Sequence, residues 1–114
     1  MHELPVTEGI FKVVMQAVEE HNPVKVNSVT IKMGEGVDYI PEIIEEYFQV
    51  FSEGTVADGA KIIADLVPTT IECKECGGIF KKDYSMRVCP SCGSPRLRPN
   101  IYGDLTVENI SMEF

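Results

Sequence analysis

The fold of this chain depends on two short stretches, CKECG at residues 73–77 and CPSCG at residues 89–93, which together contain all four cysteines. In each stretch two residues separate the cysteines and a glycine follows the second one. A short turn of this kind aims both sulfurs at one point, and two such turns complete the tetrahedral thiolate set that zinc accepts. The spacing therefore predicts one zinc site, and its ligands are Cys73, Cys76, Cys89 and Cys92.

Two other uses of paired cysteines fit this pattern less well. A pair of disulfides needs an oxidising compartment, and a dithiol redox motif does not ordinarily occur twice in mirrored form. Gly77 and Gly93 stand where the backbone of a metal-binding turn often needs a positive φ. Because four thiolates leave no open coordination position, we expect the zinc to be structural and the activity to lie elsewhere.

Length and hydropathy limit the class of protein. A chain of 114 residues is expected to form one compact domain with a small appendage. We find no apolar stretch of transmembrane length, and the N-terminus lacks the basic region and apolar core of an export signal. We therefore expect a cytoplasmic protein without a membrane partner, and cysteines held reduced by zinc agree with that compartment.

The apolar residues of the remaining chain predict two helices and three or four strands. Helical spacing runs from Pro5 to Val18 and from Pro41 to Phe51, and the helices should end near Asn22 and Gly54. Strands are predicted at 24–33, 60–67 and 105–114. In the first and last strands the apolar phase shifts by one residue, which indicates a bulge or an exchange of faces.

The order of these elements places the cysteine segment between two strands of one sheet. We expect an α+β fold in which two helices pack on a small mixed three-stranded sheet, with an inserted zinc-ribbon-like module that carries the four cysteines. Residues 1–69 together with 100–114 would form the main domain, and residues 70–99 would form the zinc-binding domain.

The net charge of −8 is unevenly distributed. Between Cys73 and Arg98 lie six of the ten cations and two acidic residues, a formal +4, so the rest of the chain sums to −12. Zinc with four thiolates adds about −2 to the module. The main alternative function is a zinc-ribbon adaptor that binds nucleic acid, although the acidic body would repel phosphate. The cations available to such an adaptor are Lys81, Lys82, Arg87, Arg96 and Arg98.

The sequence offers little for catalysis. Histidine occurs at positions 2 and 21, and we find neither a serine elbow nor a phosphate-binding glycine loop. His21 lies near the expected end of the first helix, where a cation suits the helix dipole. Glu42, Glu45 and Glu46 are interpreted as the solvent face of the second helix. We therefore expect no enzymatic activity, and a purely structural subunit remains a third reading.

The N-terminus carries a second set of metal donors. The bulk of His2 should prevent removal of Met1, so the chain would begin with a free α-amine, the amide and imidazole of His2 and the amide of Glu3. Such a cluster of nitrogens suits square-planar Ni(II) or Cu(II). Taken alone, however, an N-terminal histidine is usually part of a frayed tail.

Several motifs together resemble the HypA/HybF family of hydrogenase maturation proteins, which insert nickel. The resemblance runs nearly from Met1 to Phe114. The motifs that carry it are Met1-His2-Glu3-Leu4, Gly34-Glu35, Pro41-Glu42, Gly54-Thr55, Gly59-Ala60, Pro68 and the two cysteine pairs with their glycines. One departure is Gly36-Val37-Asp38-Tyr39, where the family usually carries a Leu-Ser-Gly-Val type of sequence.

The resemblance implies a function and a set of partners. It implies a nickel metallochaperone that binds Ni(II) as transient cargo through Met1, His2 and Glu3, with a structural Zn(II) on the four cysteines. It further implies work with the nickel-handling GTPase HypB and delivery of nickel to the large subunit of [NiFe]-hydrogenase, with urease as another recipient in some members. We expect no nucleic-acid partner, and a monomer or a weak homodimer.

Overall fold

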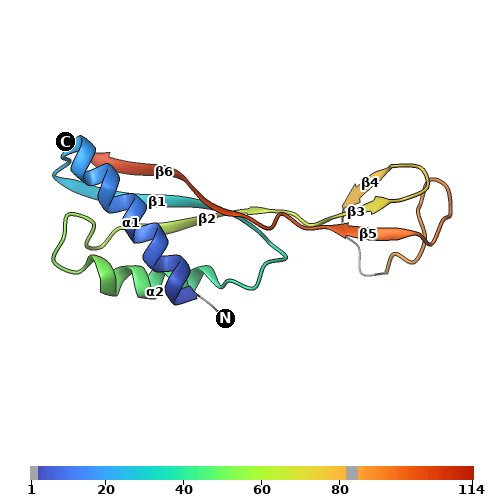
Figure 1. The fold of residues 1–114 in the computed structure, drawn as a ribbon, viewed down its shortest axis with the longest axis horizontal. Coiled ribbons are helices and arrows are strands. Elements are labelled where there is room, and N and C mark those ends of the chain that lie inside the picture. The colour runs from blue at the N-terminus through green and yellow to red at the C-terminus, as the bar shows by residue number, and fades with distance from the viewer. Residues whose placement is uncertain (1–2, 82–84) are drawn as a thin grey trace. The chain divides into compact units, whose positions relative to one another are not determined.

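The computed structural model describes residues 3–81 and 85–114, and it contains two helices and two three-stranded sheets (Figure 1). Along the chain the elements are α1 (Glu3–His21), β1 (Lys25–Gly34), α2 (Pro41–Ser52), β2 (Lys61–Val67), β3 (Thr70–Cys73), β4 (Ile79–Lys81), β5 (Leu97–Asn100) and β6 (Leu105–Glu113). One sheet has the order β2-β1-β6 and the other β4-β3-β5. The predicted α+β class is confirmed. No helix within the described ranges is long and apolar enough to cross a membrane.

The chain divides into two compact units. Unit 1 comprises Met1–Lys32, Asp38–Asp65 and Leu105–Phe114, and unit 2 comprises Met33–Val37 and Leu66–Asp104. Unit 1 carries both helices, while unit 2 carries the cysteines and the β4-β3-β5 sheet. The short segment Met33–Val37 therefore groups with the cysteine module although Asp38–Asp65 of unit 1 lies between them in sequence.

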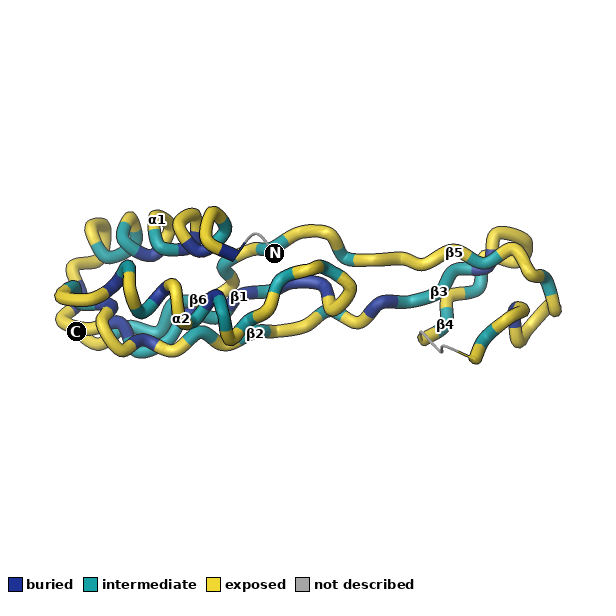
Figure 2. The backbone as a smooth tube through the Cα atoms, turned by 90° about the horizontal axis from the view of Figure 1, so that it is seen from below, coloured by how far each residue is buried: buried dark blue, intermediate teal, exposed yellow. Residues whose placement is uncertain are grey.

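The helices of unit 1 pack against each other through aromatic side chains. The ring of Phe11 on α1 meets that of Phe48 edge-on at a centroid distance of 6.0 Å and stacks on that of Phe51 at 5.8 Å. Val14 and Ile44 are fully buried on the same two helices. Figure 2 shows this burial as dark segments on the inner side of each helix. The apolar stripes in the sequence thus identified the helix faces that form the core.

Both helices end next to a residue whose backbone adopts the left-handed conformation. Asn22 adopts a φ of 51° directly after α1, and its amide donates to the Val18 carbonyl at 2.7 Å. Gly54 adopts a φ of 79° shortly after α2. Asparagine and glycine tolerate this left-handed conformation best, so the predicted helix ends are confirmed. The beginning of α1 differs from the prediction. The helix begins at Glu3, two residues before Pro5, where the helical spacing of the sequence starts.

The first sheet is mixed. The amide of Glu35, just after β1, donates to the Val67 carbonyl at the end of β2 at 2.9 Å. At the other end of β1 the amide of Val24 donates to the Glu113 carbonyl at the end of β6 at 2.8 Å. It follows that β1 runs parallel to β2 and antiparallel to β6, and α2 forms the crossover between the two parallel strands.

The predicted phase shifts occur in both strands. In β1 the fully buried side chains are first Val26 and then Val29, Ile31 and Met33, so the buried positions change from even to odd residue numbers after Val26. In β6 two successive residues, Glu108 and Asn109, are exposed where strict alternation would bury one of them. A single extra residue explains each shift, because the side-chain period of a strand is two.

Gly34, Glu35 and Gly36 form a close junction within unit 2. A Cβ atom on Gly34 would lie 1.9 Å from the Tyr102 carbonyl oxygen, and one on Gly36 would lie 2.9 Å from Oγ1 of Thr69. Between the glycines, a carboxylate oxygen of Glu35 accepts from the Thr69 amide at 2.9 Å. The two glycines therefore allow segments from both ends of unit 2 to pass close to the end of β1.

This junction can be tested with a single methyl group. Gly34→Ala should lower the free energy of unfolding by about 1–3 kcal/mol or more, because the Tyr102 backbone must move away. Gly103→Ala is the matched control, since nothing lies within 4 Å of its Cβ position. Thermal denaturation of both variants measures the difference, and equal melting temperatures would contradict the close approach.

Candidate metal centre

The four cysteines lie on two turns that the second sheet holds. β3 ends at Cys73, and β4 returns antiparallel to it after Cys76, with Thr70 opposite Lys81. On its other side β3 pairs antiparallel with β5, with Cys73 opposite Leu97. The chain that follows the second cysteine turn thus returns to the edge of the strand that carries the first cysteine. The strands of this sheet were not predicted from the sequence.

The two cysteine turns repeat the same backbone hydrogen bonds. In the first, the Gly77 amide donates to the Cys73 carbonyl at 3.0 Å and the Cys73 amide donates to the Gly78 carbonyl at 2.9 Å. In the second, the Gly93 amide donates to the Cys89 carbonyl at 2.8 Å, and the Cys89 amide donates to the carbonyl of the residue after Gly93, also at 2.8 Å. Gly77 and Gly93 have φ values of 73° and 74°. The positive φ predicted for both glycines is confirmed.

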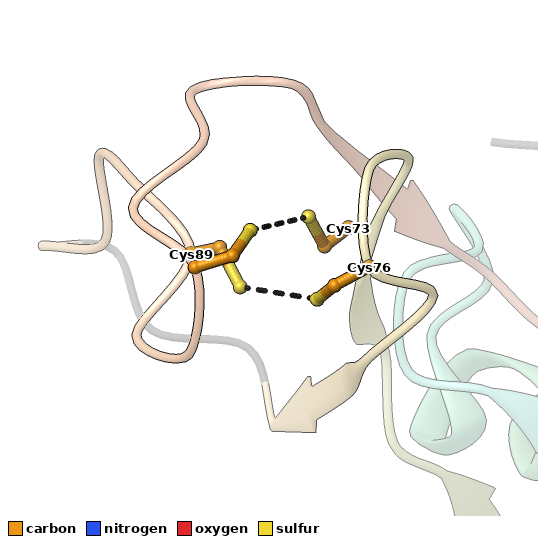
Figure 3. A group of neighbouring side chains, drawn as sticks. Cys73, Cys76 and Cys89 are labelled. Atoms are coloured by element: carbon orange, nitrogen blue, oxygen red, sulfur yellow. Dashed lines mark hydrogen bonds between the residues drawn. The ribbon is translucent and has the colours of Figure 1, made fainter.

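The turns bring all four sulfur atoms together. The Sγ atoms of Cys73 and Cys92 lie 3.6 Å apart and those of Cys76 and Cys89 lie 3.7 Å apart, and all four lie within 4.8 Å of one another. Figure 3 shows the side chains of Cys73, Cys76 and Cys89 pointing from facing turns toward one space. Zinc–sulfur bonds of about 2.3 Å place the corners of a tetrahedron about 3.8 Å apart. The separations fit a tetrathiolate metal site, and they are far too long for disulfide bonds.

The four positions differ in exposure and in proton affinity. Cys73 and Cys89 are buried, whereas Cys76 and Cys92 are exposed. Desolvation opposes ionisation of Cys89, but the backbone amides of Cys92 and Ser91 stabilise its thiolate and lower its pKa to about 7. The Ser94 amide favours the thiolate of Cys92, yet desolvation and the neighbouring thiols raise its pKa to about 12. Without a metal the cluster therefore retains protons, and a bound cation must displace them.

Ion pairs occupy part of the cationic surface of this module. Arg96 contacts Glu75 at 2.8 Å and Arg98 contacts Glu72 at 2.9 Å. By sequence, unit 2 contains six cations and five carboxylates, and unit 1 contains four cations and thirteen carboxylates. Lys82 lies outside the described residues. The surface proposed for the alternative nucleic-acid adaptor is therefore close to neutral, which weakens that alternative.

The second predicted metal site is only partly described. Met1 and His2 lie outside the described residues, and Glu3 begins α1. Glu3 is 4% exposed, and its Oε2 atom accepts a hydrogen bond from the Ile40 amide at 3.0 Å. The carboxylate is thus already bound to the backbone at the beginning of α2, which leaves the Glu3 backbone nitrogen as its candidate donor for a metal.

The sequence at the beginning of α2 indicated an uncapped helix N-terminus, but not which residue would contact it. Ile40 occupies the N-cap of α2, and an isoleucine side chain cannot accept the hydrogen bonds that a helix N-terminus needs. The Ile40 amide itself takes its acceptor from elsewhere in the chain, and a negative charge is favourable at that end of the helix dipole. Glu3 provides it from 37 residues away.

The interpretation of Glu45 was wrong, whereas those of Glu42, Glu46 and His21 are confirmed. Glu45 does not belong to the solvent face of α2, because its Oε2 atom accepts from the Ile62 amide on β2 at 3.0 Å and its side chain is half-buried. Glu42 and Glu46 are exposed as expected. His21 is the last residue of α1, which agrees with its role at the helix C-terminus.

Removing one ligand should remove the metal. Cys92→Ser should lower the bound zinc or cobalt per chain well below one equivalent, because an alcohol is a poor substitute for a thiolate. The exposed neighbour provides a control, since Ser91→Ala leaves all four sulfurs in place. Metal analysis and the absorption of the cobalt-substituted protein measure the effect. Full metal content in Cys92→Ser would exclude a four-thiolate site.

The contact between Glu3 and Ile40 should contribute to stability. Glu3→Ala leaves the Ile40 amide without its acceptor and should cost about 2 kcal/mol of unfolding free energy. Glu8→Ala removes a carboxylate one turn later, where an exposed pair with Lys12 at 3.3 Å contributes little. Chemical denaturation of both variants makes the comparison. A Glu3→Ala variant no less stable than Glu8→Ala would refute this role.

The comparisons with known proteins agree with the two cysteine turns and with the fold. The family model described as "Hydrogenase/urease nickel incorporation, metallochaperone, hypA" matches residues 1–112. Two relatives, each named hydrogenase maturation factor HypA, come from Caldanaerobacter subterraneus subsp. tengcongensis and Methanothermobacter thermautotrophicus. The first is 32% identical and the alignment covers 99% of this chain and all of the relative, while the second is 35% identical with 99% and 98% covered.

Two solution structures share the fold. One is that of the Ni metallochaperone HypA from Helicobacter pylori, with a TM-score of 0.61, 21% identity and coverage of 99% of this chain and 98% of that one. The other is described as HypA protein, with a TM-score of 0.69, 21% identity and coverage of 98% and 96%. Together with the family match along nearly the whole sequence, these findings show that the chain belongs to the HypA family.

Proposed function

We propose that this protein is a nickel metallochaperone for the maturation of hydrogenase. The observation that carries the proposal is the family match over residues 1–112, which includes the Met1-His2-Glu3 tripeptide. The names of the relatives support it, since both are hydrogenase maturation factors. The chemistry of the two donor sets also supports it, because one set suits a permanent cation and the other suits a transient one.

The nickel site we propose uses nitrogen donors at the beginning of the chain. Its ligands are the α-amine of Met1, the amide and imidazole nitrogens of His2, and the amide nitrogen of Glu3. Nitrogen donors in this arrangement favour square-planar Ni(II). The Glu3 carboxylate has a different task, because its bond to the Ile40 amide fixes the first residue of α1 directly after the metal-binding atoms.

The proposed zinc site works differently. Zn(II) on Cys73, Cys76, Cys89 and Cys92 would have all four coordination positions filled by protein, so it would hold the two turns together and offer no place for cargo. A carrier must also release its ion, and a site at the tip of a chain meets this need better than a closed cage. Nickel would therefore pass through the N-terminus, while zinc stays in unit 2.

The partners follow from the proposed role. A metallochaperone of this kind would work with the nickel-handling GTPase HypB and transfer nickel to the large subunit of [NiFe]-hydrogenase, with urease maturation as a further use. It would act in the cytoplasm, where four unpaired thiols persist. It would catalyse no reaction of its own, since delivery needs a binding site and a release step.

Nickel titration of untagged protein tests the proposal. Wild type should bind one Ni(II) per chain. His2→Ala should lose this binding because it removes the imidazole nitrogen, which is one of the proposed ligands. His21→Ala is the matched control, since it removes the other histidine of the chain at the end of α1. Calorimetry and nickel absorption spectra report the binding. Equal affinity of all three proteins would exclude the N-terminal site.

A second variant isolates the α-amine. Adding residues before Met1 converts this amine into an amide, so the extended protein should bind nickel more weakly than wild type. Its zinc content and melting temperature should stay the same, because unit 2 is unchanged. Nickel ligated by thiolate sulfur in the X-ray absorption spectrum of wild type would contradict the division between the two sites.

A further inference from the structure

The two cysteine turns of unit 2 expose their sulfurs unequally, and they do so in the same way. In each turn the first cysteine is buried and the second is exposed: Cys73 is 0% and Cys89 is 2% exposed, whereas Cys76 and Cys92 face solvent. The repeated backbone hydrogen bonds of the two turns account for this likeness. A cation in the cluster would therefore have two ligands that solutes can reach and two that they cannot.

Each exposed sulfur lies against a buried sulfur of the other turn. The Sγ atom of Cys76 is 3.7 Å from that of Cys89, and the Sγ atom of Cys92 is 3.6 Å from that of Cys73. The dashed lines in Figure 3 show that both contacts cross the space between the turns. Cysteines that respond to oxidants combine these two properties, because an accessible thiolate reacts first and a neighbouring thiolate then closes a disulfide.

We propose that the cysteine cluster is an oxidation site for hydrogen peroxide, at which two disulfides form between the turns and release zinc. Cys76 and Cys92 are the sulfurs that the oxidant attacks, and Cys89 and Cys73 are their respective partners. This inference rests on the proposed zinc site and does not depend on the proposed nickel site.

The oxidation proceeds in two steps that balance. In the first, the exposed thiolate attacks the O–O bond of hydrogen peroxide, so that an S–O bond forms and hydroxide leaves. In the second, the buried thiolate attacks the resulting sulfenic acid, so that an S–S bond forms, the S–O bond breaks and a second hydroxide leaves. Each pair of thiolates thus gives two electrons to one peroxide. A second peroxide oxidises the other pair.

Zinc leaves because its ligands lose their charge. Thiolate sulfur binds zinc as an anion, and the sulfurs of a disulfide are neutral. The first disulfide therefore removes two of the four ligands, and the second removes the other two. The oxidation needs no unfolding of unit 2 to begin, since Cys76 and Cys92 are already exposed.

Disulfides between the turns would preserve the sheet of unit 2 after zinc has left. Cys73 is the last residue of β3, and the second cysteine turn leads into β5, which pairs with β3 so that Leu97 lies opposite Cys73. A bond from Cys73 to Cys92 joins the same two turns that zinc joins. A disulfide within each turn would leave the turns unconnected. Thiol–disulfide exchange can then restore the four thiolates in a chain that has remained folded.

Peroxide treatment of the untagged, zinc-loaded full chain tests the proposal. Hydrogen peroxide should release zinc to a chromogenic chelator, with two thiols lost for each first disulfide and four at completion. Dithiothreitol followed by zinc should restore the starting protein. Met86→Leu is the matched control, because it removes the thioether in unit 2 and keeps a side chain of similar volume. Release at an unchanged rate in this variant separates cysteine oxidation from methionine oxidation.

Peptide mapping identifies the disulfides. Trypsin cleaves after Lys74 and so separates the two cysteines of the first turn, whereas both cysteines of the second turn stay on peptide 88–96. Each expected disulfide therefore links peptide 88–96 to a peptide of the first turn, either 62–74 or 75–81. Fragmentation of the linked peptides should assign the bonds as Cys73–Cys92 and Cys76–Cys89.

Two further measurements check the order of attack and the retained fold. Brief alkylation of the zinc-loaded chain with N-ethylmaleimide should label Cys76 and Cys92 at least about tenfold faster than the two buried cysteines. In the oxidised, zinc-free chain the Lys74 amide, which donates to the Arg96 carbonyl at 2.9 Å, should stay protected from hydrogen exchange. In the reduced, zinc-free chain it should exchange rapidly.

The outcomes distinguish the inference from the zinc site on which it rests. Zinc content before oxidation tests the site itself, and a chain that binds no zinc would overturn both. In a chain that holds one zinc, three results would overturn the inference alone. They are zinc and thiols retained in excess peroxide, disulfides formed within each turn, and alkylation that starts at Cys73 or Cys89.

Discussion

The cluster of four cysteine sulfurs takes the place of a hydrophobic core in unit 2. Among the described residues of unit 2, the apolar side chains that are fully buried are those of Met33 at the end of β1 and of Cys73 and Cys89. The strands of this unit are three or four residues long, apart from the ends of β1 and β2 that enter it. Such a small sheet has too little apolar surface to be stable alone, so metal–thiolate bonds must hold it.

Unit 1 depends on ordinary packing with a few polar contacts at its margins. The apolar faces of α1 and α2 meet through Phe11, Phe48 and Phe51. The polar contacts come from buried or half-buried carboxylates that accept from backbone amides, Glu3 to Ile40 and Glu45 to Ile62. Each satisfies a backbone group that the secondary structure leaves without a partner. One fixes the N-terminal residue of α1, and the other closes a sheet edge.

These two modes of stabilisation match the two metal roles that we propose. A cation enclosed by four thiolates becomes part of the fold and exchanges slowly, whereas a cation held by atoms at the tip of the chain can be transferred. The buried Glu3 carboxylate gives the tip a fixed starting point on the body. At the other end of α2's contacts, the Glu45 carboxylate closes the β2 edge of the sheet in the same body.

The sequence by itself determined the cysteine turns, the helix faces and the phase shifts in β1 and β6. These features are local: they depend on residue spacing, on the left-handed conformation of Gly77 and Gly93, and on side-chain period. The sequence also determined the order of the elements and hence the α+β class. Its motifs were sufficient to identify the family.

The tertiary structure decided the contacts between distant residues. Glu45 looked like any acidic residue on a solvent face, and Glu3 looked like a simple part of a metal motif. Both carboxylates accept from amides 17 and 37 residues away, a pairing that no local rule specifies. The close approach of Gly34 to Tyr102 is of the same kind, because it depends on where two strands pass in space. Local chemistry fixes the elements of this chain, but the partners of buried polar groups are fixed only when the elements pack.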